Sequence, residues 1–401
     1  MPARPPRVLA PSDLGAAMRG RVLVGGRVVH AEAGAVTLAD AFATARVEGA
    51  DLSAEPGELL VVRGVLEGGR VMRAHIVERA PGTEPHAAGD FARLTFSERG
   101  RNLRHRATAL DAVRSYFAGE KFVEVSTPFR VKAPGVDANV DALRAEGGYL
   151  ITSPELHLKR LLVGGMPRIF EVARVSRADE SGTLHEPEFT LLEWYRAFAD
   201  QAEVRADTEA LVARVARAVS GKDRLITPDG RVLSTRRPFP CVSVREAFRR
   251  YAGIRDASKL AERDEARYFE LLVSRVEPAL AEYERPVFLC DYPRSQAALA
   301  RISADDPSVG ERFELYAGGV ELSNGYGELT DPDEQERRFV AERERRRAEK
   351  RRVYPLDRRF LAALREGMPR AAGNALGFDR LVMLAVGAKS IAEVVAFSGR
   401  E

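Results

Sequence analysis

The strongest constraint on the fold lies in residues 170–195, which read FEVARVSRADESGTLHEPEFTLLEWY. Two runs of alternating residue types flank a polar loop, a pattern that predicts two β-strands. Side chains alternate between the two faces of a strand, so the second run should present two different surfaces. The two sets are Phe189, Leu191, Glu193 and Tyr195 on one face, and Thr190, Leu192 and Trp194 on the other. The pattern therefore predicts one face for a ligand and one for a core.

The ligand face and the loop carry side chains that suit a bound nucleotide. Arg177 offers a fork of donors to an α-phosphate, and Phe189 offers a ring for adenine, with Arg380 as an opposing plane. His185, in the loop, can reach the outer phosphates. Together these residue types predict an ATP site.

Two later segments add acidic and basic groups. Glu314 and Glu321 flank a Gly-Gly turn, a spacing that lets two carboxylates from adjoining strands converge on one Mg²⁺ ion and its nucleotide phosphates. In GNALGFDRL, residues 373–381, Arg380 stands where a helix is expected to begin, which predicts a second arginine on the nucleotide. Three further polar residues alternate onto one strand face: Asn324, Tyr326 and Glu328.

These segments resemble the motifs of class II aminoacyl-tRNA synthetases of the lysine type, over roughly residues 92–401. Motif 1 would be a helix from about Arg101 to Ala118 followed by FVEVSTP, motif 2 the strand pair above, and motif 3 GNALGFDR. The resemblance implies an α/β (α+β) fold with an antiparallel-sheet catalytic core. It also implies a homodimer, because motif 1 forms a two-fold interface in this class.

Within this group the chain most resembles the truncated relatives that attach β-lysine to a lysine of elongation factor P. Ser153 stands where lysyl-tRNA synthetases usually have alanine, and Ala375 where they usually have glycine. The LEWY ending at Tyr195, SQAALARIS (residues 295–303) and GAKSIAEVVAFS (residues 387–398) also resemble these ligases.

The resemblance implies amino-acid activation followed by transfer. The carboxylate of (R)-β-lysine or lysine attacks the α-phosphorus of ATP, and the acyl-adenylate then acylates a lysine of elongation factor P. Arg177 and Arg380 are the implied catalytic residues. Glu314 and Glu321 are the implied Mg²⁺ ligands.

For the amino acid, the resemblance assigns Glu155 to the amino group near the reacting carboxyl, and Glu328 with Tyr195 to the distal ammonium. Ala375 with Ser153 would reshape the pocket around the shifted amino group of β-lysine. The remaining implied pocket residues are Glu193, Asn324 and Tyr326. Buried carboxylates also occur as purely structural ion-pair partners, and that alternative stays open for the three glutamates.

The motif 2 loop departs from the family pattern, which usually reads Phe-Arg-Asn-Glu and then His-Asn. Here Asp179 takes the glutamate position and is expected to accept from the adenine amino group, although it is one methylene shorter. Glu186 puts a negative charge where an amide is expected, and a loop cation is missing. Both changes should weaken the grip on pyrophosphate.

Residues 1–88 are compositionally separate from residues 92–401. The segments 21–29, 35–49, 58–66 and 70–78 predict five short strands with glycine-rich turns, an OB-like β-barrel. Phe42 is its one aromatic residue, so binding of tRNA by base stacking is poorly supported. Residues 201–285 predict a helical insertion, and residues 336–352 a solvated helix of mixed charge.

Composition limits the binding partners, metal sites and cellular location that can be expected. With 62 basic and 59 acidic residues the net charge is only +3, so the molecule as a whole is not an obvious binder of polyanions. Two cysteines without a nearby ligand cluster predict neither a zinc site nor a disulfide framework. A membrane span and a signal peptide are not predicted, which makes the reducing cytoplasm the expected location.

Two other functions stay open. An authentic lysyl-tRNA synthetase would need an RNA-competent barrel, which the residues before Asp90 do not indicate. A non-catalytic paralogue that binds an amino acid or a nucleotide for regulation would account for the altered motif 2 loop. The preferred lysine isomer and the role of the barrel also stay open.

Overall fold

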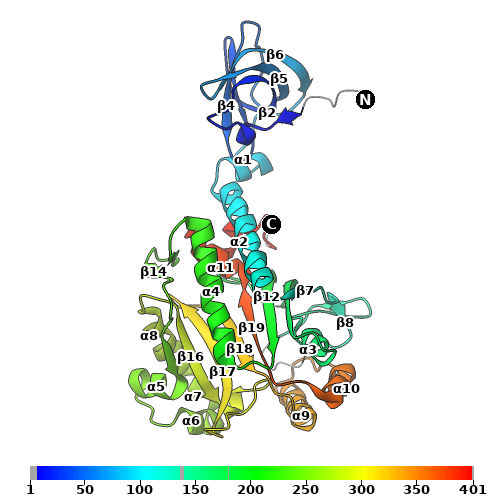
Figure 1. The fold of residues 1–401 in the computed structure, drawn as a ribbon, viewed down its shortest axis with the longest axis vertical. Coiled ribbons are helices and arrows are strands. Elements are labelled where there is room, and N and C mark those ends of the chain that lie inside the picture. Colours follow the sequence, from blue (N-terminus) through cyan, green and yellow to red (C-terminus); the bar gives the residue numbers. More distant parts are fainter. Residues whose placement is uncertain (1–6, 136–139, 179, 400–401) are drawn as a thin grey trace. The chain divides into compact units, whose positions relative to one another are not determined.

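The computed structural model describes residues 7–135, 140–178 and 180–399. The chain divides into two compact units, residues 1–104 and 105–401. The first is built mainly of strands and the second of a large sheet with helices on it (Figure 1). Helix α2 (Arg99–Gly119) contains the boundary. None of the helices in the described ranges is both long and apolar enough to cross a membrane.

The first unit contains the predicted OB-like barrel. Its strands pair in the order β1-β2-β3-β4-β6-β5, and an additional β2–β5 pairing closes the five longer strands on themselves. Alternate residues such as Val24, Val28, Leu60 and Val62 fill the interior, as period-two patterning requires. The strands are β1 (Val8–Leu9), β2 (Gly20–Glu32), β3 (Ala35–Ala39), β4 (Thr44–Glu48), β5 (Leu59–Glu67) and β6 (Arg70–Ala80), followed by helix α1 (Asp90–Thr95).

The second unit is organised around an eight-stranded sheet, in the order β15-β16-β17-β18-β19-β12-β11-β7. The pairings from β16 to β11 are antiparallel, whereas the edge strands β15 and β7 run parallel to their neighbours. The strands are β7 (Val123–Glu124), β11 (Arg168–Ser176), β12 (Glu188–Ala197), β15 (Cys241–Ser243), β16 (Val287–Pro293), β17 (Val309–Ala317), β18 (Val320–Gly327) and β19 (Ala371–Gly377). This sheet is the predicted antiparallel catalytic core.

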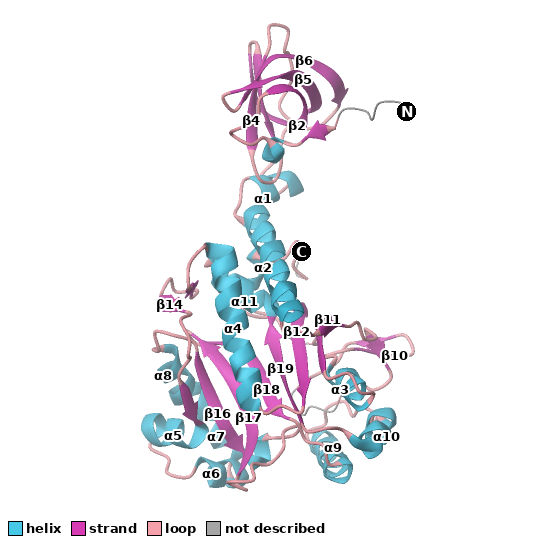
Figure 2. Cartoon of the chain, in the orientation of Figure 1, coloured by secondary structure: helices cyan, strands magenta, loops and turns pink. Residues whose placement is uncertain are grey.

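Two small sheets and the helices complete the unit. The sheets are formed by β8 (Arg130–Val131), β9 (Arg144–Ala145) and β10 (Gly148–Leu150), and by β13 (Arg224–Ile226) and β14 (Val232–Ser234). The helices are α3 (Glu155–Val163), α4 (Gln201–Ser220), α5 (Val244–Ala247), α6 (Ala257–Arg263), α7 (Glu265–Leu271), α8 (Glu277–Ala281), α9 (Pro332–Ala348), α10 (Arg358–Gly367) and α11 (Phe378–Val386). Helix α4 lies across one face of the large sheet (Figure 2).

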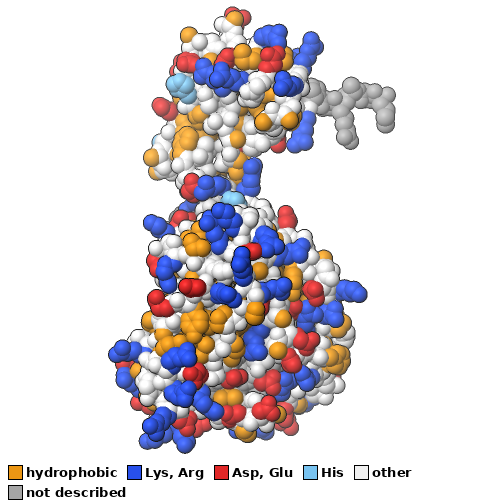
Figure 3. Space-filling view, turned by 60° about the vertical axis from the view of Figure 1, so that its left-hand side comes forward, with side chains coloured by type: hydrophobic (Ala, Val, Ile, Leu, Met, Phe, Trp, Pro, Cys, Tyr) orange, Lys and Arg blue, Asp and Glu red, His pale blue; other side chains and the backbone are white. Residues whose placement is uncertain are grey.

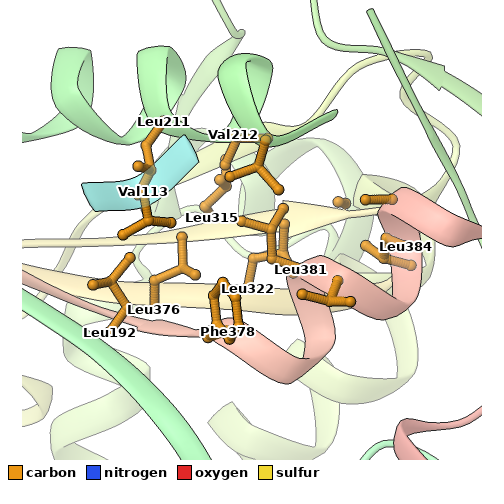
Figure 4. Close-up of a cluster of buried hydrophobic side chains, with 14 of the residues drawn as sticks. Val113, Leu192, Leu211, Val212, Leu315, Leu322, Leu376, Phe378, Leu381 and Leu384 are labelled. Atoms are coloured by element: carbon orange, nitrogen blue, oxygen red, sulfur yellow. The ribbon is translucent and has the colours of Figure 1, made fainter. Parts of the chain in front are cut away.

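The main core fills the space between that sheet face and helices α4 and α11. Leu192 of β12 and Leu376 of β19 meet Leu211 of α4 and Leu381 of α11 there (Figure 4). Leu191 packs in a different cluster on the opposite sheet face. The predicted alternation along β12 is therefore confirmed, and the face that bears Leu191 is left for the site.

Two segments predicted to be helices on the surface contain residues that are buried in the structure. Residues 201–285 hold α5–α8, but also α4, whose Leu211, Val212 and Val215 are fully buried in the main core. The prediction of a solvated helix over residues 336–352 is wrong in part. Arg346 of α9 is 0 % exposed and forms an ion pair with Asp141, because this helix packs against the loop that leads into the site.

Candidate active site

A cavity of about 510 Å³ opens on the sheet face that bears Leu191. The predicted site residues that line it are Ser153, Glu155, Arg177, His185, Phe189, Glu314, Glu321, Asn324, Tyr326, Ala375 and Arg380. Glu193, Tyr195 and Glu328 lie buried, with 1 %, 3 % and 0 % of their surfaces exposed. Asp179 lies outside the described residues. The structure thus brings residues from four sequence segments around one cavity, 153–155, 177–189, 314–326 and 375–380.

Strand register explains how these residues meet. Glu193 of β12 pairs with Ala375 of β19, Ala375 pairs with Asn324 of β18, and Asn324 pairs with Glu314 of β17. Because cross-strand partners share a sheet face, this row crosses the floor of the site from Glu193 to Glu314. The end that holds Glu314 and Glu321 is called the acidic end below. Glycine at 373 is required in the next row, since a Cβ there would lie 2.3 Å from ring carbons of Tyr195.

A bulge brings Glu321 to the same face as Asn324. The two residues are three positions apart, which in a regular strand would place their side chains on opposite faces. The register shifts between Leu315 and Tyr316, so that Ser323 pairs with the former and Glu321 with the latter. Leu322 is the extra residue and packs into the main core.

Glu193 is held beneath the cavity by two hydroxyl groups. The Tyr195 hydroxyl donates to its Oε1 at 2.6 Å, and the Ser153 hydroxyl donates to its Oε2 at 2.8 Å. Burial, together with the nearby charge of Glu155, raises the pKa of Glu193 to about 8. Ser153 therefore positions a carboxylate, in addition to lining the pocket as predicted.

Lys159 is a buried cation that sequence reasoning missed. Its ammonium lies 2.6 Å from Glu155 and 2.5 Å from Glu328, and its side chain is 0 % exposed. Burial raises the pKa of Glu328 to about 7, opposed by Lys159. In TSPELHLKRLL, Glu155 and Lys159 are four residues apart, a spacing that predicts an ion pair on a helix. This spacing could have identified the contact of Lys159 with Glu155, but not its contact with Glu328.

Arg312 is the second missed cation, and it organises the acidic end. It donates to Glu314 at 2.5 Å and to the side-chain amide oxygen (Oδ1) of Asn324 at 3.2 Å, and its guanidinium lies 4.4 Å from the centre of the Tyr292 ring. Arg312 lies two residues before Glu314, so the two side chains share a strand face, and this spacing could have predicted their contact. Hydroxyl groups of Tyr292 and Tyr316 also donate to Glu314.

The donor set at the acidic end fits a divalent cation. Burial raises the pKa of Glu321 to about 7, and the charge of Glu314 adds to the shift. A carboxylate whose charge is disfavoured by burial and by a neighbouring carboxylate gains from a hard cation, and Mg²⁺ usually takes one or two protein carboxylates plus substrate phosphates. The described residues contain no cluster of three or more His, Cys, Asp or Glu side chains that could hold a metal ion.

The two predicted phosphate arginines line the cavity. Arg380 donates to the backbone oxygens of Leu184 and Glu321 at 3.1 and 2.8 Å, and its Nη2 lies 2.7 Å from Nε2 of His185. Burial, followed by Arg380, lowers the pKa of His185, so its imidazole is neutral near pH 7. The guanidinium of Arg177 lies 5.1 Å from the centre of the Phe189 ring, and its Nε is buried without a hydrogen-bond partner among the described residues.

Glu186 makes structural contacts that the sequence did not predict. It is 2 % exposed, and its carboxylate accepts from the Ser398 hydroxyl at 2.9 Å and from the Gly399 backbone N–H at 3.1 Å. The backbone N–H of Ile391 also donates to the carbonyl of Thr183 in the same loop. The charge that was expected to weaken pyrophosphate binding therefore anchors the segment around residue 398 to the motif 2 loop.

The ion pair between Arg106 and Asp379 connects motifs 1, 2 and 3. Arg106 of α2 forms an ion pair with Asp379 at the start of α11 and donates to the Thr190 hydroxyl at 2.7 Å. Asp379 is 2 % exposed and accepts from the Thr190 backbone N–H at 2.8 Å. This pair fixes α11, and with it Arg380, against the strand that carries Phe189 and Glu193.

Comparison with known proteins agrees with this geometry. The family model for class II tRNA synthetases (D, K and N) matches residues 86–401. The chain is 39 % identical over 317 residues to the elongation factor P–(R)-β-lysine ligase of Edwardsiella ictaluri, covering 74 % of this chain and 94 % of that protein. The enzyme of the same name from Photorhabdus laumondii gives the same identity and coverage.

Proposed function

Because the chain belongs to the elongation factor P–(R)-β-lysine ligase family, within the class II tRNA synthetases of the D, K and N type, we propose that it activates (R)-β-lysine or lysine with ATP and transfers it to a lysine of elongation factor P. The observation that carries the proposal is a cavity with two chemically different ends. At one end Glu155 lines the cavity for an ammonium group, with Glu193 joined to the lining residue Ser153 and Glu328 joined to Glu155 through Lys159. At the other end Arg177 and Arg380 line the cavity for phosphate.

In the first step an amino-acid carboxylate oxygen forms a bond to the α-phosphorus of ATP, and the bond to pyrophosphate breaks. Arg177 and Arg380 supply fixed positive charge beside the oxygens on which negative charge develops. Phe189 offers its ring to the base. Mg²⁺ bound between Glu314 and Glu321 would neutralise phosphate charge.

In the second step the unprotonated amine of the acceptor lysine attacks the acyl carbon, AMP leaves with the bonding electron pair, and the nitrogen releases one proton to solvent. A covalent protein nucleophile is not required. The roles of the chain's own residues are to hold the amino acid by its ammonium groups and to keep the adenylate oriented. Ser153 donates a hydrogen bond to Glu193, and Ala375 is the strand partner of Glu193. We propose that these two residues accommodate the β-amino group.

The barrel supports a protein acceptor in preference to tRNA. Phe42, the aromatic residue among its strands and turns, has the guanidinium of Arg104 4.0 Å from its ring centre. Arg46, on an exposed barrel position, is paired with Glu32 and Glu48. Acidic and basic side chains are interspersed on the visible face of each unit (Figure 3). Single-stranded RNA is usually bound by aromatic rings that stack on bases and by a stripe of basic side chains that bind phosphates. The described part of the barrel offers little of either.

We also propose a homodimer that works in the cytoplasm. The motif 1 strand β7 lies at the edge of the large sheet, and Val123 on it and Phe129 just beyond it are 49 % and 42 % exposed. Val113 and Phe117 on α2, the motif 1 helix, are instead buried in the core of the same unit. An exposed edge strand with neighbouring apolar side chains favours association with a second copy.

The test is mass spectrometry of elongation factor P after incubation with the enzyme, ATP, Mg²⁺ and either (R)-β-lysine or lysine, with lysine tRNA as a parallel acceptor. We expect a mass increase of one lysyl group on one lysine of the protein and little charging of the tRNA. Arg380→Ala, which removes a fixed cation at the phosphates, should lower amino-acid-dependent pyrophosphate exchange by about a hundredfold. Efficient tRNA charging with unmodified elongation factor P would establish the synthetase alternative, and absent pyrophosphate exchange would favour a non-catalytic binder.

A further inference from the structure

Three carboxylates and one ammonium cluster at the amino-acid end of the cavity, where Glu155 lines the cavity and the other three groups are buried. Glu155 and Lys159 lie one turn apart on α3, Glu193 lies on β12, and Glu328 follows β18. The Lys159 ammonium bridges Glu155 and Glu328, while Glu193 is hydrogen-bonded by Tyr195 and Ser153. One oxygen of Glu328, Oε1, has no hydrogen-bond partner among the described residues.

The charges in this cluster do not balance. Three carboxylates and one ammonium carry a net charge of −2 when all are ionised. Arg301 is the further cation that acts on Glu328, but its guanidinium is bound to Glu311 at 3.0 and 2.5 Å. Uncompensated buried charge is costly, so the cluster should recruit cations or protons from outside.

We propose that Lys159 is a built-in counter-ion that sets how many ammonium groups the pocket accepts: it neutralises one of three carboxylates and leaves two negative charges for the two ammonium groups of a diamino acid. The inference rests on the proposed function, because it concerns the same pocket. Lys159 is a positioning and specificity-determining residue in this account, since it acts through the carboxylates that meet the substrate. It also holds Glu155 and Glu328 at one ammonium, which fixes the separation of the two subsites.

The protonation behaviour of the cluster supports this count. Burial lowers the pKa of Lys159, but Glu155 and Glu328 raise it more, so that it stays above its ordinary value and the cation is permanent near pH 7. The pKa of Glu328 is raised to about 7 and that of Glu193 to about 8. Near pH 7 the free pocket therefore holds protons that the ammonium groups of the substrate must displace.

The first experiment uses the unmodified enzyme. Calorimetric titration with lysine at pH 7, in two buffers of different ionisation enthalpy, measures the protons exchanged on binding. We expect release of about one proton or more, since ammonium groups favour the ionised carboxylates. Norleucine, which lacks the distal ammonium, should release fewer protons and bind much more weakly. Binding of lysine without proton release would overturn the proposal.

The second experiment replaces the cation by an apolar side chain of similar length. Lys159→Met should make the remaining carboxylates hold their protons more tightly. If that proton affinity rises about tenfold, KM for lysine at pH 7 should also rise about tenfold, and the loss should shrink towards pH 9. The rise in kcat/KM with pH should therefore move to higher pH. Arg160→Met removes the neighbouring charge on α3, which lines a separate hollow, and should leave the pH profile unchanged.

The outcomes separate this inference from the proposed function. A loss in Lys159→Met that is equal at every pH would show a purely structural lysine and overturn the inference, as would an unchanged KM. If Lys159→Met does not give a cooperative thermal transition, the proton release of the unmodified enzyme decides. Proton release and a shifted profile without any modification of elongation factor P would refute the proposed acceptor and leave the role of Lys159 standing.

Discussion

We predict that one added methyl group at Gly373 damages lysine recognition by displacing a ring beneath the pocket. A Cβ at this position would lie 2.3 Å from two ring carbons of Tyr195 and 3.0 Å from Oε1 of Glu328. Tyr195 is 3 % exposed and donates its hydroxyl hydrogen to Glu193. The ring therefore cannot move aside without disturbing that hydrogen bond.

The size of the effect follows from the two contributions involved. Over-packing of a buried site costs roughly 1–3 kcal/mol of folding free energy, which should lower Tm by roughly 2–8 °C. A hydrogen bond to a charged group contributes about 1.5–3 kcal/mol. If Gly373→Ala breaks the bond between Tyr195 and Glu193, kcat/KM for lysine should fall about 10- to 100-fold, with KM for ATP little changed.

Two other glycines provide matched controls. A Cβ at Gly325 would also lie 2.3 Å from a ring, that of Phe313, but on the core face of the sheet. A Cβ at Gly119, at the end of α2, would have nothing within 4 Å. Gly325→Ala should therefore lower Tm but raise KM for lysine less than Gly373→Ala does. Gly119→Ala should change neither Tm nor KM for lysine.

The assay is pyrophosphate exchange at varied lysine and ATP, with thermal melting of each variant. The reasoning is refuted if Gly373→Ala keeps a normal KM for lysine, or if Gly325→Ala raises that KM equally. The first result would show that the ring adjusts without cost. The second would show that strain in the sheet, and not the position of Tyr195, governs lysine binding.

Three further outcomes are expected. Glu321→Gln, which halves the carboxylate pair, should raise the Mg²⁺ concentration needed for half-maximal exchange by about tenfold or more, and an unchanged Mg²⁺ titration would contradict the metal assignment. Ser398→Ala leaves a buried oxygen of Glu186 short of a donor and should raise KM for ATP severalfold and lower Tm, whereas KM for lysine should stay constant. Burial raises the pKa of Glu193 from its ordinary 4.5 to about 8, so the folded protein binds more protons than the unfolded chain in that window. The stability of the ligand-free enzyme should accordingly fall as pH rises from about 5 to 8, and lysine or Glu193→Gln should flatten the fall, as thermal melts across pH would reveal.

Much of the fold and of the residue set is predictable from local patterns in the sequence. Alternation along residues 189–195 separates Leu192 from Leu191, and the structure places them on opposite faces of the sheet. The barrel strands follow from short alternating runs between glycine-rich turns. Arg177, Glu321 and Arg380 carry recognisable chemistry in recognisable contexts, and they line one cavity. Such features depend on neighbours within a few residues, so the chain shows them directly.

Tertiary structure alone decided how those residues combine. Glu321 faces the site because a bulge interrupts β18, and Lys159 reaches Glu328, far along the chain, because α3 packs beside the end of that strand. Glu186, expected to repel pyrophosphate, accepts hydrogen bonds from Ser398 and Gly399. Each outcome depends on strand register and on contacts between segments far apart in the chain. Those are set by how the whole sheet and its covering helices pack, and a local pattern contains no record of that packing.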